Sequence, residues 1–547
     1  MDNTTPSGVS LDLHDDTNRR AIERELPGYI STRRWFGGKA RTIREVRFVD
    51  SLAIVHGESH RTYIAIAEVA YEDGDSQRYV LPLNVVLASE IGAEALTAHG
   101  LIATWQVDAA AVRRTLIATD AIFDADFASG LLDAVATGHR WAGERGDIVA
   151  WSTPELASLA PAGTDLTPSV LGTEQSNTSI LYGQALILKL FRRLEEGTSP
   201  ELEIGRALQT ANFAETPPLG GALEYVQPGG EPLTLAVLQG YVPNRGDAWG
   251  YTIETLVDYF RSALEGTPDT RLAEVPTPDL IELSRHSAPE GLDDVSVGYL
   301  RSAAQLGRTT ARMHLALARV GGGPAFEPEP LDIEHREHMY AAMRLLADEA
   351  FGLLRARQGE ILPDARDEAA DVLARSETIE RHFSPLIGSD TGGLRTRVHG
   401  DYHLGQVLYT GGEFYIIDFE GEPVRNLADR RRKHSPLKDV AGMVRSFHYA
   451  AYSGLFNHGR AHNRKVAGDR DAERWADAWY YWTSAAFLRE YLATTEGSGL
   501  LPEGEDGLRV LLSAYLLEKA VYELVYEMNN RPTWVAIPLK GISALLS

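Results

Sequence analysis

Residues 399–406 read HGDYHLGQ, and residues 416–420 read IIDFE a short distance downstream. Asp401 supplies a carboxylate, while Gln406 and Asp418 supply an amide oxygen and a second carboxylate. Transfer of a phosphoryl group needs one carboxylate to orient and deprotonate the attacking hydroxyl. It also needs oxygen ligands that hold Mg²⁺ against the phosphates. The two segments therefore contain the side-chain types that a phosphoryl-transfer site requires.

The order and spacing of these residues match the catalytic pattern of protein kinases, H-R-D-x-x-x-x-N followed by D-F-G. We predict that Asp401 is the catalytic base. Gln406 stands where the asparagine would be, and it is predicted to hold Mg²⁺ together with Asp418, because glutamine carries the same amide oxygen on a longer arm. Alone, His-Gly-Asp could be a chance turn. The strand-borne Asp418 in register favours the kinase interpretation.

Other polar residues flank the predicted base. His399 is expected to hold the catalytic loop by hydrogen bonds. His403 lies two residues past Asp401 and is predicted to act in catalysis by hydrogen bonding the acceptor hydroxyl; the alternative is that it only stabilises the loop. Glu420 and Glu422 are further candidates for assisting a metal or orienting Arg425.

The composition is that of a globular protein. The chain has 547 residues, enough for two to four domains or subdomains. Its net charge of −24 disfavours nucleic acid and anionic lipid as partners. Cysteine is absent, which excludes disulfides, zinc thiolates and thiol nucleophiles. The sequence has no apolar stretch of transmembrane length and no signal pattern, so we expect a cytoplasmic protein with access to ATP.

Residues 1–110 are predicted to form a small α+β subdomain. Residues 1–12 are polar and are expected to be a disordered lead. The following helix has an apolar stripe of Ile22, Leu26 and Ile30. Three strand-like runs cover residues 46–55, 62–71 and 78–87, with a hairpin turn at 72–75. Pro82 predicts that the third run is an edge strand or is bulged.

Residues 111–245 are predicted to contain a helix at 124–137 and then the features of a nucleotide-binding lobe. Residues 170–182 have strand character at both ends and small polar residues between. The tip of this hairpin, with Gln175, Ser176 and Asn177, is predicted to contact ATP phosphates through backbone N–H groups and hydroxyls. The alternative is an ordinary turn, because no glycine-rich phosphate motif is present.

A lysine in an apolar strand indicates a paired functional group, since burying an unpaired charge is costly. Lys189 lies in such a run, residues 185–191, and Glu203 lies on the predicted helix that follows. We assign Lys189 to the α- and β-phosphates of ATP and Glu203 to orienting it; the alternative is a lysine that reaches solvent from an edge strand. Gln239 and Tyr241 are predicted to form the hinge that binds adenine through its backbone.

Residues 246–547 are mostly helical by apolar spacing. The predicted helices cover residues 252–264, 297–320, 335–353, 365–382, 439–455, 472–492 and 507–528, and the stretches at 266–294 and 322–332 are predicted to be loops. The charge run at 430–434 is interpreted as a solvated surface loop rather than a phosphate-binding patch.

The chain resembles the bacterial maltokinases, which lie within the aminoglycoside- and choline-kinase-like superfamily. The resemblance runs along nearly the whole chain. Its blocks are RRWFGGKAR at 33–41, LGTEQSN at 171–177, VHGDYHLGQ at 398–406, DFEGEP at 418–423, SPLKDVAGMVRSFHYA at 435–450 and EKAVYELVYEMNNRPTWVAIP at 518–538. The first and last blocks are the most specific, because the catalytic block alone identifies only the superfamily.

The resemblance implies an α+β, bilobal, eukaryotic-like kinase fold. It would have an N-terminal cap (residues 1–110), an intermediate subdomain that completes a β-rich N-lobe (111–245) and a helical C-lobe (246–547). It also implies ATP-dependent phosphorylation of maltose at the anomeric hydroxyl, with Mg²⁺ as cofactor and a role in trehalose and α-glucan metabolism. Members are often fused behind a trehalose synthase; this chain is expected to lack that domain, so association with a separate synthase is a possible partner interaction.

Lys519, Tyr522 and Tyr526 have helical i, i+3, i+7 spacing and therefore share one face. The resemblance places them in the maltose site, where tyrosines would stack on sugar rings; the alternative is a tyrosine stripe packed in a helical core. Two other functions stay open. A glucosamine kinase shares the cap and the catalytic block, and a non-catalytic sensor would need the loss of Asp401, Asp418 or Lys189.

Overall fold

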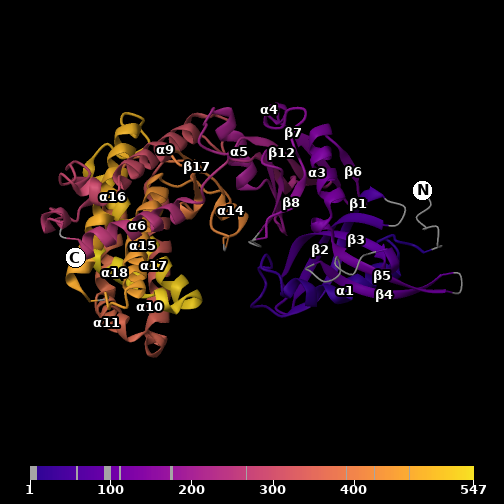
Figure 1. Cartoon of the computed structure of the whole chain (residues 1–547), viewed down its shortest axis with the longest axis horizontal. Helices are drawn as coiled ribbons and strands as arrows, with labels where there is room; N and C mark the ends of the chain where they lie inside the picture. Colours follow the sequence, from indigo (N-terminus) through magenta and orange to yellow (C-terminus); the bar gives the residue numbers. More distant parts are fainter. Residues whose placement is uncertain are drawn as a thin grey trace. The chain divides into compact units, whose positions relative to one another are not determined.

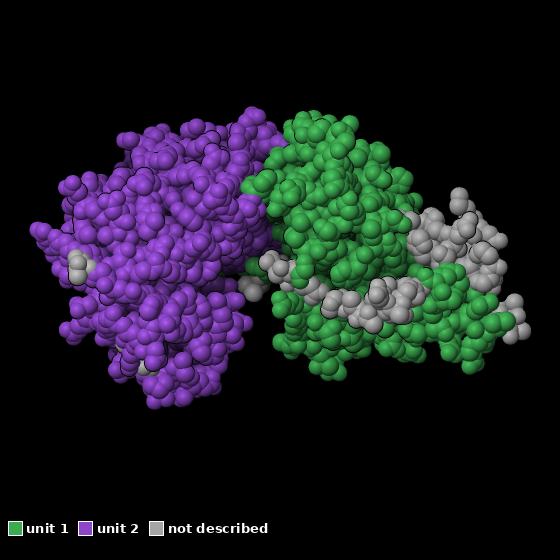
Figure 2. All heavy atoms as spheres, in the orientation of Figure 1, with its two compact units in different colours: residues 1–206, 217–243, 423–427 green, residues 207–216, 244–422, 428–547 purple. Residues whose placement is uncertain are grey.

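The computed structural model describes residues 9–56, 60–90, 100–109, 112–172, 177–266, 268–389, 391–423, 425–466 and 468–546. The chain divides into two compact units, shown in Figure 2. One contains residues 1–206, 217–243 and 423–427, and the other contains 207–216, 244–422 and 428–547. The described strands are concentrated in the first unit and the long helices in the second (Figure 1). The predicted division into a β-rich N-terminal region and a helical C-terminal region is confirmed.

The first unit begins with an antiparallel sheet of six strands, in the order β1-β2-β3-β5-β4, with β11 added beside β3. The strands are β1 Ile43–His56, β2 His60–Tyr71, β3 Ser76–Leu87, β4 Leu101–Ala109, β5 Val112–Asp120 and β11 Arg193–Leu194. Side chains alternate between the two faces of a strand. On β2, Ala65 and Ala67 pack in the core that includes α1 (Asp16–Ser31), whereas Ile64 and Ile66 pack in the core that includes α3 (Ala125–Thr137).

Pro82 lies in the interior of this sheet, so its assignment to an edge strand was wrong. The N–H of Val80 donates to Arg192 O, and residue 82 directs its backbone to the same side of β3 because alternate residues do. On that side β11 pairs only with residues 78 and 79, and β5 begins to pair only at Leu83. The N–H that proline lacks therefore falls between two neighbouring strands, where no ladder bond is lost.

The structure confirms some of the other predictions for this region and contradicts others. The helix with Ile22, Leu26 and Ile30 on its buried face and the turn between β2 and β3 are confirmed. Of the predicted disordered lead, residues 9–12 are described, and Val9 and Leu11 are buried in the core beside α1. The sheet also continues past the predicted boundary at residue 110, because β5 pairs with both β4 and β3.

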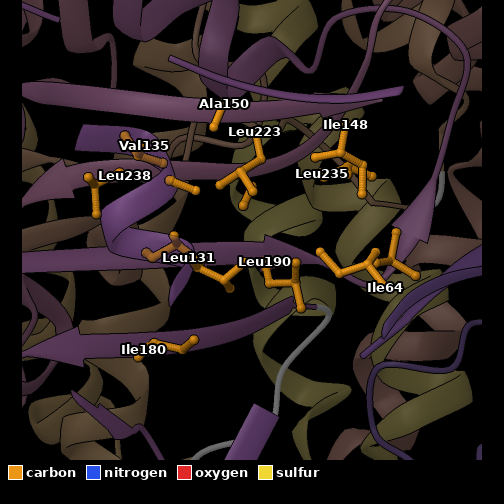
Figure 3. Close-up of a cluster of buried hydrophobic side chains, with 14 of the residues drawn as sticks. Ile64, Leu131, Val135, Ile148, Ala150, Ile180, Leu190, Leu223, Leu235 and Leu238 are labelled. Atoms are coloured by element: carbon orange, nitrogen blue, oxygen red, sulfur yellow. The ribbon is translucent and has the colours of Figure 1, made fainter. Parts of the chain in front are cut away.

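The second sheet of this unit has seven antiparallel strands in the order β6-β7-β12-β13-β10-β9-β8. They are β6 Arg140–Ala142, β7 Asp147–Ser152, β8 Pro168–Val170, β9 Asn177–Tyr182, β10 Leu186–Phe191, β12 Leu219–Val226 and β13 Leu233–Gly240. One face packs with α3. Figure 3 shows Leu131 and Val135 of α3 gathered with strand residues such as Leu190 and Leu223. The other face carries α5 (Pro200–Thr210), through Leu202, and α4 (Leu156–Leu159) lies near β12.

The second unit is built from long helices (Figure 1). They are α6 Ala248–Glu265, α9 Tyr299–Arg319, α10 Ile333–Ala356, α15 Leu437–Ala461, α16 Arg470–Thr495, α17 Glu505–Asn530 and α18 Ala536–Leu545. Shorter elements connect them: α7 Leu280–Leu283, α8 Leu292–Val295, β14 Glu329–Pro330, α11 Arg366–Ala374, α12 Ser376–Phe383, α13 Pro385–Gly388, β15 Leu394–Arg395, β16 Val407–Tyr409, β17 Phe414–Ile416 and α14 Leu427–Arg430. Among the described residues, no helix has both the length and the apolar character needed to cross a membrane.

Three sequence predictions for this region need correction. The single helix predicted at 365–382 is broken at Arg375 into α11 and α12. The predicted loop at 266–294 contains the helix α7, whose apolar residues are buried. In the charge run, Lys433 is buried: its ammonium donates to Glu327 O at 2.7 Å and pairs with Glu329. A lysine with two such partners is structural rather than a solvated surface group.

Candidate active site

The loop that carries Asp401 is fastened to the first turn of α15 by a buried carboxylate. Asp439 is only 1 % exposed, and its two oxygens accept the backbone N–H groups of His399 (2.8 Å) and Gly400 (3.0 Å). His314 of α9 lies with Nε2 2.9 Å from the same carboxylate, and its Nδ1 lies 2.9 Å from the hydroxyl of Tyr491. Burial raises the pKa of Asp439, but these hydrogen bonds and the nearby imidazoles lower it below its usual value. Asp439 is therefore an ionised anchor for the loop.

Two more residues of α15 continue this support at helical spacing. Gly442 lets the helix approach the loop closely, because a Cβ there would lie 2.5 Å from Tyr402 O. Ser446 Oγ accepts the N–H of Leu404 at 3.1 Å. Residues 439, 442 and 446 lie on one face of a helix. One face of α15 thus holds the loop from its start to its end.

His399 joins this loop to the strand that precedes Asp418. Its Nε2 lies 2.9 Å from Ile417 O, and its Nδ1 lies 3.4 Å from the N–H of Asp401. A carbonyl oxygen only accepts, so Nε2 carries the proton and Nδ1 is the acceptor. This is the loop-holding role that the sequence indicated for His399.

The hairpin of β16 and β17 brings Gln406 next to Asp418. Val407 is paired with Ile416, and the N–H of Ile417 donates to Gln406 O at 3.0 Å. Asp418 then takes a left-handed backbone conformation with φ of +67°. Aspartate tolerates this conformation better than most residues, and such strain is typical of functional positions. The two oxygen-bearing side chains that were predicted to hold Mg²⁺ thus leave neighbouring strands at the same end of a hairpin.

Asp401 shares its environment with a lysine from α17. Lys519 Nζ lies 3.3 Å from Asp401 Oδ1 and 3.7 Å from an oxygen of the buried Glu422. Burial raises the pKa of Asp401, but the charges of Lys519 and of the nearby imidazoles lower it below its usual value. Burial lowers the pKa of Lys519, and the carboxylates around it raise that pKa above its usual value. At neutral pH the site therefore contains a carboxylate and an ammonium, both ionised.

His403 has two relationships in the structure. Its Nδ1 accepts the N–H of Gly405 at 3.0 Å, which caps the short turn at Leu404–Gln406. Its Nε2 faces Asp401 Oδ2 at 4.0 Å. Burial is the largest influence on the pKa of His403 and lowers it, which favours the neutral ring. Because Nδ1 accepts a hydrogen bond, the proton of the neutral ring is on Nε2. His403 is both a loop-stabilising group and a hydrogen-bond donor directed to the side of Asp401 that Lys519 leaves open.

The exposed face of α17 continues from Lys519. Its ammonium lies 4.9 Å from the ring centre of Tyr522, which is half-buried, and Tyr526 is 44 % exposed. Tyr526 is thus not part of a packed core. On the same helix Glu523 is paired with the buried Arg445 of α15 at 2.6 Å. The exposed surface offers aromatic faces beside the Lys519–Asp401 pair, a combination suited to a ligand with apolar ring faces and many hydroxyls.

The residues predicted to bind ATP belong to the first unit. Lys189 is on the face of β10 that packs with α5, as the alternation with buried Leu188 and Leu190 requires. In the first turn of α5 the fully buried carboxylate is Glu201, at 2 % exposure, whereas Glu203 is half-buried. Glu201 also accepts a hydrogen bond from Gln239 Nε2 at 3.2 Å.

The remaining nucleotide-site predictions give mixed results. Asn177 is buried at the start of β9, opposite Phe191. Gln175 and Ser176 lie outside the described residues. The N–H of Gly240 donates to Pro218 O and that of Tyr241 to Ala185 O, both at 2.8 Å. These two N–H groups are therefore used by neighbouring backbone, and the prediction that Gln239 and Tyr241 form the adenine-binding hinge stays a prediction.

Several residues of the site were not identified from the sequence. Asp439 and Arg445 are charged residues within the apolar pattern of α15, and Glu201 and Glu523 are carboxylates buried by contacts distant in sequence. A charge within an otherwise buried helix face is the one signal that could have indicated Asp439 and Arg445, since such a charge needs a partner. Glu422 was predicted to assist a metal or to orient Arg425; the structure also brings it within 3.7 Å of Lys519, which the sequence did not indicate.

Comparison with known protein families is consistent with this site. Residues 29–124 match the maltokinase N-terminal cap domain. Residues 297–476 match the phosphotransferase enzyme family. The second match includes the catalytic loop, the β16–β17 hairpin and α15, but it ends before α17. The proposed acceptor face on α17 thus lies outside the part of the chain that the family model describes.

The individual relatives share less than a third of their aligned residues with this chain. A protein named glucosamine kinase from Streptacidiphilus jiangxiensis is 28 % identical over 406 residues, which cover 72 % of this chain and 78 % of that protein. Another of the same name from Mycolicibacterium smegmatis is 25 % identical over 375 residues, or 68 % and 78 % of the two chains. A solved structure of glucosamine kinase in complex with glucosamine, ADP and inorganic phosphate has a TM-score of 0.60 at 20 % identity, covering 97 % of this chain and 99 % of its own. This likeness shows a common fold. The chain combines a maltokinase N-terminal cap domain with a phosphotransferase-family domain on a kinase-like fold.

Proposed function

We propose that this protein transfers the γ-phosphoryl group of ATP to the anomeric hydroxyl of maltose, giving maltose 1-phosphate and ADP. The observation that carries the proposal is the position of Asp401. Its carboxylate lies 3.3 Å from Lys519 of α17, which neighbours Tyr522, and its loop is hydrogen-bonded through His399 to Ile417, the residue before Asp418. An acceptor bound on α17 would present a hydroxyl to a carboxylate kept ionised by Lys519.

In this proposal each polar group of the loop has one task. Asp401 accepts the proton of the attacking hydroxyl and orients its oxygen toward the phosphorus, and the leaving group is ADP. The Nε2–H of His403, 4.0 Å from Asp401 Oδ2, would donate to the acceptor hydroxyl. Asp439 and the face of α15 keep the loop in position, which matters because catalysis of phosphoryl transfer depends mainly on positioning and electrostatics.

Gln406 and Asp418 fit the requirements of a magnesium site. Both offer oxygen ligands, which Mg²⁺ prefers, and they leave the same end of a hairpin. A bound Mg²⁺ would offset the negative charge of the phosphate oxygens during transfer. In the first unit, Lys189 would bind the α- and β-phosphates, and the burial of Glu201 favours this residue over Glu203 as the group that orients Lys189.

Two acceptors compete in this proposal, because the relatives described above are named glucosamine kinase. Glucosamine carries an amine that is protonated near neutral pH and would bind best among unpaired carboxylates. Here Lys519 already lies 3.3 Å from Asp401 and 3.7 Å from Glu422. A second cation in that place would be repelled, because like charges at short distance cost free energy. This observation favours a neutral sugar, and a long aromatic face favours a disaccharide.

A panel of acceptors tests the proposal. Maltose, glucose, trehalose and glucosamine should be assayed separately with ATP and Mg²⁺, with release of ADP as the readout and NMR to locate the phosphate. We expect the highest kcat/KM for maltose and a product phosphorylated at the anomeric carbon. A higher kcat/KM for glucosamine would replace maltose by the amino sugar. No ADP release with any sugar would instead favour a non-catalytic sensor.

The cellular setting is also part of the proposal. A cytoplasmic location would supply ATP, and a separate trehalose synthase would be a natural partner for a maltose-consuming enzyme. Co-purification of the tagged protein with the synthase of the same cell would test this association. Cells that lack the synthase gene are the control.

A further inference from the structure

Far from the catalytic loop, two histidines and one glutamate meet at the ends of two helices. His458 and His462 lie four residues apart at the C-terminal end of α15, and Glu265 is the last residue of α6. His458 is 19 residues beyond Asp439 on the same continuous helix, which corresponds to roughly 29 Å along its axis. The function proposed above uses none of these three side chains.

The distances within this cluster are those of ligands around one metal ion. Glu265 Oε1 lies 3.5 Å from His458 Nε2 and 3.1 Å from His462 Nε2. One ligand atom from each of the three residues lies within 4.8 Å of the others. Ligand atoms at Zn–N and Zn–O distances of about 2.0–2.1 Å, arranged tetrahedrally, are about 3.3 Å apart. The two observed separations lie on either side of that value.

The hydrogen bonds of the cluster leave a nitrogen lone pair directed at the carboxylate. His462 Nδ1 lies 2.9 Å from His458 O, and a carbonyl accepts, so Nδ1 carries the proton in the neutral ring. Its Nε2 then carries a lone pair that faces Glu265. Metal-binding histidines commonly donate their second ring N–H to a backbone carbonyl in this way, which fixes the tautomer that coordinates.

Neighbouring cations are committed to other partners. Arg464 is paired with Asp469 at 2.6 Å, and Arg261 is paired with Asp258 at 2.7 Å. Glu265 therefore faces two imidazoles, although two guanidinium groups are close in the chain. His462 and Glu265 are about half-exposed at their side chains, at 51 % and 44 %, so an ion can reach them from solvent.

We propose that Glu265, His458 and His462 form a binding site for a divalent transition-metal ion of the Zn²⁺ class. Two imidazole nitrogens and one carboxylate oxygen are a ligand set that suits Zn²⁺ and disfavours Mg²⁺, and water would complete the tetrahedron. The ion joins the C-terminal ends of α6 and α15. Its effect is on the stability of the helical unit, because binding to the folded state alone stabilises that state.

The test uses the full chain, stripped of metal with a chelator and dialysed into buffer with 5 mM Mg²⁺. Calorimetric titration with ZnCl₂ should give one site with a Kd in the micromolar range or tighter. Co²⁺ should give visible absorption typical of tetrahedral nitrogen and oxygen ligation. Zn²⁺ should also raise the thermal midpoint of the wild type. His462→Gln and Glu265→Gln should each weaken Zn²⁺ binding at least tenfold.

His338→Gln is the matched control, because His338 is an exposed histidine of α10 whose Nδ1 also contacts a carbonyl one turn earlier. It should bind Zn²⁺ as the wild type does. His458 is not substituted, because it is buried and its loss could unfold the helix end. Circular dichroism of the metal-free variants checks that they are folded. Absence of Zn²⁺ binding at 100 µM, or equal binding by His462→Gln and wild type, would overturn the proposal and leave only a contact between two imidazoles and a carboxylate.

Discussion

The ammonium of Lys519 lies 3.3 Å from Oδ1 of Asp401, although the two residues are 118 positions apart in the chain. This pair connects the catalytic loop to the helix that is proposed to bind the acceptor. The lysine keeps the carboxylate ionised, and the carboxylate, together with Glu422, keeps the lysine protonated.

Substitution of Lys519 should shift the pH dependence of activity. The pKa of Asp401 is below its usual value because Lys519 and the imidazoles outweigh burial. In Lys519→Met the lysine charge is absent while burial, which raises this pKa, stays. The acid limb of the kcat/KM profile, which reports ionisation of the free enzyme, should therefore move to higher pH. Lys540→Met, which removes a lysine paired with Glu368 and Glu473, should leave the limb in place; a shift of equal size in both variants would contradict the assignment.

Asp401→Asn should remove the base while keeping the shape of the side chain. We expect kcat to fall about 10²–10⁴-fold at saturating substrates, the usual effect of losing a positioned general base. ATP binding, measured by calorimetry, should be unchanged. Asp247→Asn is the control, because Asp247 caps α6 and asparagine caps equally well. Retention of more than about a tenth of the wild-type kcat would exclude Asp401 from this role.

Substitutions of Gln406 and Asp418, the two residues predicted to hold Mg²⁺, should reduce activity to different degrees. Asp418→Asn should be inactive at any Mg²⁺ concentration, because it removes the charged ligand while asparagine still tolerates the left-handed backbone. Gln406→Ala should recover part of its activity at high Mg²⁺, since only a neutral ligand is lost. Activity as a function of Mg²⁺ concentration, after chelation, is the measurement. Full activity of Asp418→Asn would mean that the metal binds elsewhere.

Tyr522→Ala should affect the acceptor rather than the nucleotide. Loss of its packing and hydroxyl should cost about 1–3 kcal/mol, which corresponds to an increase of about 5- to 150-fold in the KM for maltose. The KM for ATP should change little. Tyr340→Ala on α10 is a control for the general loss of a partly buried tyrosine. Unchanged maltose kinetics in Tyr522→Ala would remove α17 from the acceptor site.

Two glycine substitutions in helices should have opposite effects on stability. Gly352→Ala in α10 meets no atom within 4 Å and should stabilise the protein by about 0.5–1 kcal/mol, the usual gain in helix propensity. Gly442→Ala would place its Cβ 2.5 Å from Tyr402 O, so it should destabilise the protein and lower kcat with little effect on acceptor preference. Urea denaturation and steady-state kinetics measure both. Stabilisation by Gly442→Ala would show that the loop does not need close contact with α15.

The parts of the site that are local in sequence were predictable. Gln406 and Asp418 flank a short hairpin with a glycine turn, so their proximity follows from the pattern of strand and turn. The α17 face follows from helical spacing. The pairing of Lys519 with Asp401 depends on tertiary packing and has no local signal. Glu201 and Glu203 differ by two residues in one helix turn, and only the packing of α5 on its sheet decides which of them is buried.

Strand prediction failed where the chain gave no clear alternation. The hairpin of β4 and β5 was not predicted, and its pairing with β3 carries the first sheet beyond residue 110. Pro82 shows the opposite error. Because proline lacks an N–H, we predicted that it would not lie in an interior strand. However, β11 and β5 pair with β3 on either side of Pro82, so this residue needs no hydrogen-bond partner there. Neither outcome could be read from a single segment, because each depends on which strands become neighbours.

The loop that carries Asp401 rests on α15, whereas the proposed acceptor surface is on α17, and Lys519 of α17 forms an ion pair with Asp401 of the loop. Under the proposed function, changes at Tyr522 and Tyr526 would alter the choice of sugar while Lys519 and the phosphoryl-transfer loop stay as they are. An engineer who wishes to exchange acceptors has a short helix face to vary and a loop to leave untouched. Under the proposed function, one sugar kinase could evolve into another by substitutions on this helix face alone.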